Sequence, residues 1–247
     1  MVKRKSINCP QDAFKIFWDL ETSDKFRSRI VSIGYCSDDP YFEGELLLLP
    51  KVPINMNAIK VHGYTIDKLK KEDAKDTKTQ LNYFMRKIES LNKQVVMVAH
   101  NGKSFDTHVL RHELEIEDVP IAKNIIGFVD TYHWIKWDLK FQSANLDALM
   151  INILKKNARD IHGALEDTKI LREITMHLLE KHSNCLGYFE NMEEFLARTE
   201  KWKSENEIIK DIMEEIIANV ETISCDHSNM IEIDNLYVCA NCRFCSF

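Results

Sequence analysis

One stretch near the N-terminus constrains the fold more than any other, residues 15–22 with the sequence Lys-Ile-Phe-Trp-Asp-Leu-Glu-Thr. Its apolar, aromatic run predicts a buried strand that ends in two carboxylates, Asp19 and Glu21. Alternate side chains of a strand share a face, so both acids point the same way. Two like charges at the edge of an apolar sheet are costly unless a cation neutralises them. The alternative is a turn residue and a solvated acid after a strand, unless the rest of the chain supplies partners.

The composition is that of a globular protein. With 247 residues, of which 45% are hydrophobic and 29% charged, the chain can bury one full core and a small appendage. No window reaches the roughly 18 uninterrupted apolar residues of a membrane span, and the first residues lead into polar sequence rather than an apolar signal core. We therefore expect an intracellular protein with no membrane partner. The formal charge of -6 argues against nonspecific coating of nucleic acid, although carboxylates loaded with divalent cations become positive in effect.

Hydrophobic patterning predicts an α/β fold. Three N-terminal strands joined by short links favour an antiparallel meander, and a β-branched run at 95–100 indicates a central strand buried on both faces. The predicted strands cover residues 13–20, 29–36, 44–49, 95–100 and 125–129. The predicted helices cover residues 77–91, 105–115, 145–155 and 163–182, with Ser104 as a cap for the second. Polar residues that follow a central strand mark the edge where open α/β sheets bind ligands.

Two further acids stand at element ends, Asp106 after the strand at 95–100 and Asp167 at the start of the last predicted helix. Phosphodiester cleavage by two divalent ions needs about four carboxylates converging on metals roughly 4 Å apart. A nearby neutral histidine can take the proton from the attacking water. His162 would lie in the loop that enters the helix, free to swing over the site.

Other polar residues have simpler interpretations. His62 and His100 each sit at an element end, where an imidazole can bond to the backbone, so structural roles are favoured. Asp130 is a candidate fifth acid near the metals, but a structural role is favoured there too. Asp147 is expected on a helix surface.

Three motifs carry a resemblance to a known family. Asp19-Leu20-Glu21-Thr22, then His100-Asn101 with Phe105-Asp106, then His162-x-Ala164-x-x-Asp167 resemble the three exonuclease motifs of the DEDDh (DnaQ-like) family, in the same order and with similar spacing. The segments His62-Gly63-Tyr64-Thr65 and Asn145-Leu146-Asp147-Ala148-Leu149 also resemble family segments. The resemblance covers residues 12–182. The seven-residue form of the second motif is most similar to that of the three-prime repair exonucleases, whose proline-rich insert and membrane anchor are absent here.

The resemblance implies an RNase H-like fold, a mixed five-stranded sheet flanked by helices, and release of nucleoside 5′-monophosphates from the 3′ ends of DNA or RNA. It implies that Asp19, Glu21, Asp106 and Asp167 bind two Mg²⁺ or Mn²⁺ ions and that His162 is the general base. Gly163 stands where a tyrosine-type sister family has its tyrosine, so the histidine type fits better. The substrate contacts implied are Leu20, Thr22, Tyr64, His62 and Asn101, with core packing as the alternative for Tyr64. A homodimer through a sheet edge is left open.

The C-terminal part differs in kind. Apolar residues at helical spacing predict one or two amphipathic helices from Met192 to about Ile223, which pack on the nuclease domain or, alternatively, bind a protein partner. Four of the 7 cysteines crowd the last 23 residues, which in a reducing compartment suggests metal ligation. A hairpin about Asp234-Asn235 would assemble a structural Zn²⁺ site. Its expected ligands are Cys225, His227, Cys239 and Cys242, with Cys245 as the spare.

The expected organisation is a lead-in at 1–11, an exonuclease domain at 12–184, a helical segment at 185–223 and a zinc module at 224–247. Two other functions remain alternatives to catalysis. One is a nucleic-acid-binding module on the same fold without turnover. The other is an interaction protein whose C-terminal segment recruits a larger complex.

Overall fold

The computed structural model describes residues 10, 12–25, 28–157, 162–182 and 188–203, together with the backbone of 230–233, 236–239 and 245–246. The chain forms two compact units, Met1–Thr199 and Glu200–Phe247. Across the described residues, every helix is too short or too polar to cross a membrane.

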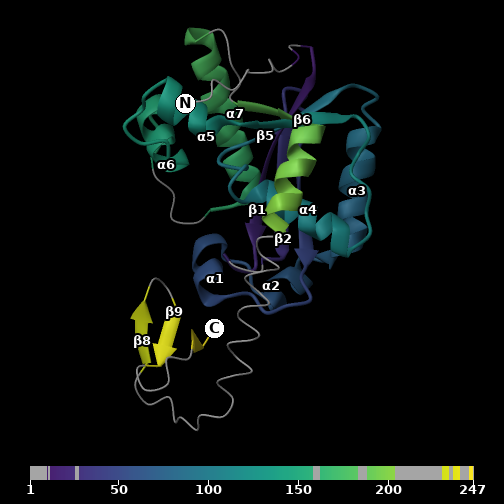
Figure 1. The fold of residues 1–247 in the computed structure, drawn as a ribbon, viewed down its shortest axis with the longest axis vertical. Coiled ribbons are helices and arrows are strands. Elements are labelled where there is room, and N and C mark those ends of the chain that lie inside the picture. Colours follow the sequence, from purple (N-terminus) through teal and green to yellow (C-terminus); the bar gives the residue numbers. More distant parts are fainter. Residues whose placement is uncertain are drawn as a thin grey trace. The chain divides into compact units, whose positions relative to one another are not determined.

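A seven-stranded mixed sheet forms the centre of the first unit, in the order β4-β3-β2-β1-β5-β6-β7 (Figure 1). β1 pairs antiparallel with β2 and parallel with β5. The strands β2–β3 and β6–β7 are antiparallel pairs, whereas β3–β4 and β5–β6 are parallel. The strands are β1 (Phe14–Thr22), β2 (Ile30–Ser37), β3 (Gly44–Leu49), β4 (Lys75–Asp76), β5 (Val95–Ala99), β6 (Ile125–Asp130) and β7 (Tyr188–Asn191).

The two faces of β1 belong to different cores. Ile16, Trp18 and Leu20 pack in the main apolar cluster, to which α3 (Thr77–Glu89) and α4 (Asp106–Ile116) contribute. Phe17, on the other face, packs with Leu171 of α7 (Ala164–Lys181). By the alternation of the strand, Asp19 and Glu21 share the face of Phe17, towards α7. The predicted α/β class, a mixed sheet flanked by helices, is therefore confirmed.

The sheet has seven strands and not the expected five, because a short strand is added at each edge. β4 contains two exposed residues and β7 contains four, too few for an alternating pattern to show in the sequence. Two short helices, α1 (Met56–His62) and α2 (Ile66–Lys71), are also additions to the prediction. Their N-caps are Asn55 and Thr65, whose side chains accept backbone N–H bonds in the first turn.

Two predictions about helices were wrong in detail. Ser104 does not cap α4: the N-cap position is Phe105, which has no side-chain capping bond. The helix predicted at 145–155 is α-helical only over α6 (Leu146–Leu149) and continues as a π-helix, η2 (Met150–Leu154). The preceding segment has the same mixed character, with α5 (Thr131–His133) followed by the π-helix η1 (Trp134–Asp138). Hydrophobic periodicity does not separate these helix types over so few residues.

The second unit contains a three-stranded sheet in the order β10-β9-β8. β8 (Met230–Ile233) and β9 (Leu236–Cys239) pair antiparallel, which confirms the predicted hairpin, and β10 (Cys245–Ser246) pairs with β9. Of the helical segment predicted from Met192, residues 192–203 are helical. Its remainder and three of the expected zinc ligands, Cys225, His227 and Cys242, lie outside the described residues.

Candidate active site

The candidate site forms where three parallel strands end. β1, β5 and β6 run in the same direction, so their C-terminal ends lie at one edge of the sheet. β1 ends with Asp19 and Glu21, β5 leads into the loop 100–105 and then Asp106, and β6 ends with Asp130. This is the edge at which open α/β sheets place ligands.

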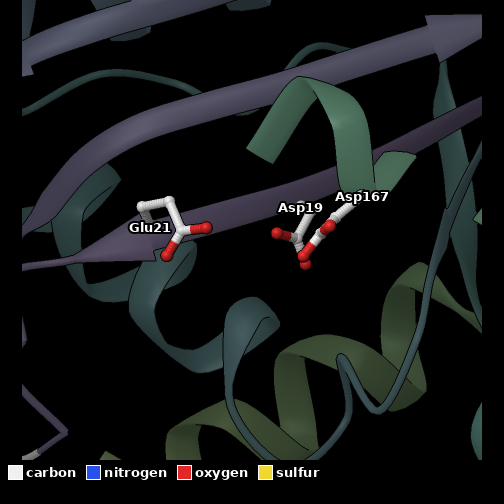
Figure 2. A group of neighbouring side chains, drawn as sticks. All are labelled: Asp19, Glu21 and Asp167. Atoms are coloured by element: carbon white, nitrogen blue, oxygen red, sulfur yellow. The ribbon is translucent and has the colours of Figure 1, made fainter. Parts of the chain in front are cut away.

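Three of the four predicted acids meet directly. One carboxylate oxygen from each of Asp19, Glu21 and Asp167 lies within 4.8 Å of the others, and this is the single such His, Cys, Asp or Glu group in the described part of the chain. Figure 2 shows the Asp19 and Glu21 side chains extending from β1 beside Asp167 from the first turn of α7. Like charges at this spacing repel unless a cation lies between them. Carboxylate oxygens are the ligands that Mg²⁺ and Mn²⁺ prefer, so the donors fit such an ion.

Gly34 allows α7 to bring Asp167 to the sheet. It lies directly opposite Asp19 in the β1–β2 pairing. A Cβ atom added to Gly34 would overlap the backbone of Ala164 and Leu165 in the first turn of α7. The absent side chain therefore lets the helix backbone approach β2 within a turn of Asp167. A glycine inside an otherwise apolar strand signals such an approach in the sequence, but it does not identify the partner.

Asp106, the fourth predicted acid, is not one of the three that meet directly. It is the first residue of α4 and is buried. The backbone N–H of Leu20, the residue between Asp19 and Glu21, favours the ionised form of this carboxyl. Burial raises the pKa of Asp106 to about 7, and the neighbouring Asp130 contributes to the shift. A cation bound beside Asp106 would favour the ionised form instead.

The loop that carries Asn101 is held by Asp130. The Asp130 carboxylate accepts N–H bonds from Asn101 and Lys103, each at 3.0 Å, and a third at 2.9 Å from Tyr132. Asp130 thus makes the structural contacts favoured for it. His100 bonds to Thr131 Oγ1 at 2.8 Å and to the Ala144 carbonyl at 2.6 Å, also a structural arrangement. The exposed Asn101 has a left-handed backbone, with φ of 62°.

His162 lies between two carboxylates. Its Nδ1 is 3.4 Å from Asp167 Oδ2, and its Nε2 is 3.4 Å from Asp147 Oδ2. Asp147, expected on an open helix surface, therefore faces the predicted base from α6. The backbone N–H of His162 donates to the Val61 carbonyl at 3.1 Å, so this part of the loop is anchored to α1 rather than free to swing. The ring is one-third exposed, 34%, and accessible to a substrate.

The other predicted substrate contacts belong to β1, which contains Leu20 and Thr22, and to the end of α1, where His62 is followed by Gly63 and Tyr64. The Tyr64 N–H donates to His62 Nδ1 at 3.0 Å, so the proton of this ring is on Nε2, which donates to the Thr22 carbonyl at 3.2 Å. Tyr64 is buried with Val31, Ile54 and Leu69, and its hydroxyl donates to Glu45, which supports the packing alternative. The Leu20 side chain lies in the main core.

The fold and the site define an α/β domain with a carboxylate cluster suited to divalent cations. Residues 17–175, well over half of the chain, match the RNase_T family model, described as "Exonuclease". The chain belongs to this exonuclease family, and its predicted DnaQ-like character is confirmed.

Two curated relatives are consistent with this family membership. The DNA polymerase III subunit epsilon of Haemophilus influenzae is 26% identical over 165 residues, which are 66% of this chain and 62% of that protein. The chloroplastic/mitochondrial exonuclease DPD1 of Arabidopsis thaliana is 28% identical over 179 residues, which are 65% of this chain and 54% of the relative. The chain therefore spans less than two thirds of the length of either relative.

Among solved structures, the fold is similar to that of Escherichia coli exonuclease I in complex with a dA16 oligonucleotide. The TM-score is 0.55 at 15% identity, covering 68% of this chain and 41% of the other. This likeness supports the fold.

Proposed function

We propose that this protein is a metal-dependent 3′–5′ exonuclease that releases nucleoside 5′-monophosphates from DNA or RNA. One observation carries the proposal: Asp19, Glu21 and Asp167 present oxygens within 4.8 Å of one another, with the His162 ring 3.4 Å from Asp167. Membership in the exonuclease family and the nucleic-acid enzymes among the relatives support it.

The four acids would hold two Mg²⁺ or Mn²⁺ ions, with Asp106 completing the set from the loop side. When bound, such ions activate a water molecule and stabilise the leaving oxygen. Water attacks the phosphorus, the P–O3′ bond to the preceding nucleotide breaks, and the terminal nucleotide leaves with its 5′-phosphate.

His162 would take the proton from the attacking water. His162 Nδ1 makes a hydrogen bond to Asp167 in the structure, but Nε2 also lies 3.4 Å from Asp147 Oδ2, so with metals on Asp167 the Asp147 carboxylate would favour the tautomer whose proton is on Nε2. This tautomer leaves the Nδ1 lone pair on the side of the carboxylate cluster, where it would accept the proton of the attacking water. Asp147 would thus act through His162.

The terminal nucleotide would lie along the end of β1. Asn101 is exposed in the loop after β5. Thr22 is the last residue of β1, and its carbonyl accepts a hydrogen bond from His62. Leu20 would contribute through its backbone, and His62 and Tyr64 would hold Thr22 in position. We retain both DNA and RNA as substrates.

A structural Zn²⁺ in the second unit is a separate proposal. Its support is the β8–β9 hairpin, which ends at Cys239 three residues before Cys242. Cys225 and His227 would complete the four ligands, and Cys245 is the alternative. A small unit of this kind gains from a metal the stability that it cannot obtain from a core.

The test compares the wild type with Asp167→Ala on 5′-labelled single-stranded DNA and RNA of matched sequence, with Mg²⁺ or EDTA. We expect a ladder that shortens from the 3′ end only with Mg²⁺ and only with the wild type. Tight binding without cleavage would instead support a binding module. Capture of partner proteins that depends on residues 190–247 but survives Asp167→Ala would support the recruiting role.

A further inference from the structure

Arg198, in the helix at 192–203, uses every N–H donor of its guanidinium group. Nε and Nη2 donate to the two carboxylate oxygens of Glu190 in β7, each at 2.8 Å. Nη1 donates to the Lys103 carbonyl at 3.0 Å and to His108 Nε2 at 2.8 Å, and Nη2 donates to Thr107 Oγ1 at 3.0 Å. An arginine has five such donors, so this side chain fixes its neighbours in both distance and direction.

Two of these contacts reach the loop that precedes Asp106. The Lys103 carbonyl is held by Arg198 while the Lys103 N–H is held by Asp130 at 3.0 Å. The Thr107 hydroxyl accepts a hydrogen bond from Arg198 and donates one to the Gly102 carbonyl at 2.7 Å. The loop is therefore clamped from the β6 side by Asp130 and from the β7 side by Arg198.

The loop needs such support because its conformation is unfavourable by itself. Asn101 has positive φ, a region that few residues other than glycine adopt. A Cβ atom on Gly102 would lie 2.6 Å from Ala99 Cβ, so the loop turns back tightly onto the end of β5. Conformations of this kind persist where the surrounding contacts determine them.

The Arg198 cluster is built to stay intact. Its Glu190 partner is buried, and the Arg198 side chain is 25% exposed. Burial and the Arg198 charge lower the pKa of His108 to about 4, so the imidazole stays neutral and accepts from Nη1. A charge pair in these surroundings is lost only at the cost of an unpaired buried ion.

We propose that Arg198 is a positioning residue for Asp106: by holding the Lys103 carbonyl and the Thr107 hydroxyl, it sets where the fourth carboxylate meets the divalent ions. This inference rests on the proposed function of the carboxylate cluster. It places a determinant of the metal site in the segment that follows the family match.

The test uses the full chain and a double variant, Arg198→Met/Glu190→Met, which removes the clamp without leaving a buried charge. The matched control is Arg172→Met/Asp38→Met, which removes an exposed ion pair. Titration calorimetry measures Mn²⁺ binding in the absence of nucleic acid, and hydrogen exchange reports on the amides of residues 101–105. Supporting contacts of metal ligands are worth about 10- to 100-fold in metal affinity, so we expect at least a 10-fold weaker Mn²⁺ affinity and faster loop exchange in the Arg198 variant alone.

Wild-type Mn²⁺ affinity and loop exchange in a folded double variant would overturn the inference. If that variant does not fold, Arg198→Lys decides by the same measurements, because lysine keeps a charge opposite Glu190 but lacks the five-donor geometry. Weakened Mn²⁺ binding in Arg198→Lys supports the inference, and unchanged binding overturns it. A wild type that binds Mn²⁺ and cleaves no nucleic acid would refute the proposed function while leaving the role of Arg198 to be decided by affinity.

Discussion

Substituting Gly34 by alanine tests the packing that brings Asp167 to Asp19. The added Cβ would overlap the Ala164 carbonyl group, whereas ordinary van der Waals contact begins at 3.4 Å. The N-terminal turn of α7 must therefore retreat, by an amount on the order of 1 Å, and Asp167 moves with it away from β1. Metal ligands tolerate only about 0.2 Å of displacement, and a misplacement of about 1 Å costs roughly 100-fold in rate.

We therefore expect Gly34→Ala to reduce kcat by about 100-fold and to weaken Mn²⁺ binding. Overpacking would cost about 1–3 kcal/mol in the free energy of unfolding. The assay is 3′-end shortening of labelled single-stranded DNA, with circular dichroism as the test of folding. Gly163→Ala is the matched control, because a Cβ at this position, one residue before α7, meets nothing within 4 Å. A folded Gly34→Ala protein with wild-type rate and Mn²⁺ affinity would refute the reasoning.

Three other predictions follow from the site and the second unit. His162→Ala should lower the cleavage rate by about 10²- to 10⁴-fold with little change in Mn²⁺ binding. Asp147→Leu should lower the single-turnover rate of the wild type but leave that of His162→Ala unchanged. Because folding raises the pKa of Asp106 to about 7, metal-free protein should lose stability as the pH rises from about 4 to 7. Melting curves in EDTA should show this loss diminished in Asp106→Asn. Cys239→Ser/Cys242→Ser should release zinc, measured by a chromogenic chelator, and lower the melting temperature; unchanged zinc content would contradict the proposed site.

Sequence patterning predicted the elements that bury a regular face. The strands at 44–49 and 95–99 and the helix from residue 164 have continuous or periodic apolar residues, and the structure places them within a residue or two of expectation. The two acids at the end of β1 were evident because like charges at the end of a buried strand require a partner, whereas Asp106, seven residues after β5, was predicted from the order and spacing of the motifs.

Contacts between distant segments gave weaker signals. Asp147 stands in a segment that resembles the family, yet its approach to His162 depends on a four-residue helix and the π-helical turn after it. Gly34 marks a close approach without naming the helix concerned. Arg198 has no local pattern at all, because its partners lie 8 to 95 residues away in the chain. Such contacts are decided by tertiary packing rather than by local preference.

The edge strand β7 has a practical consequence for recombinant work. A fragment cut to the family match would end at residue 175, inside α7, and would lose β7 together with Arg198. The backbone of β6, which pairs with β7 from Gly127 to Asp130, would then be an open edge, a ready template for aggregation. Poor yield or weak metal binding from such a fragment would report on its truncated sheet, and the expressed protein should extend at least to residue 203.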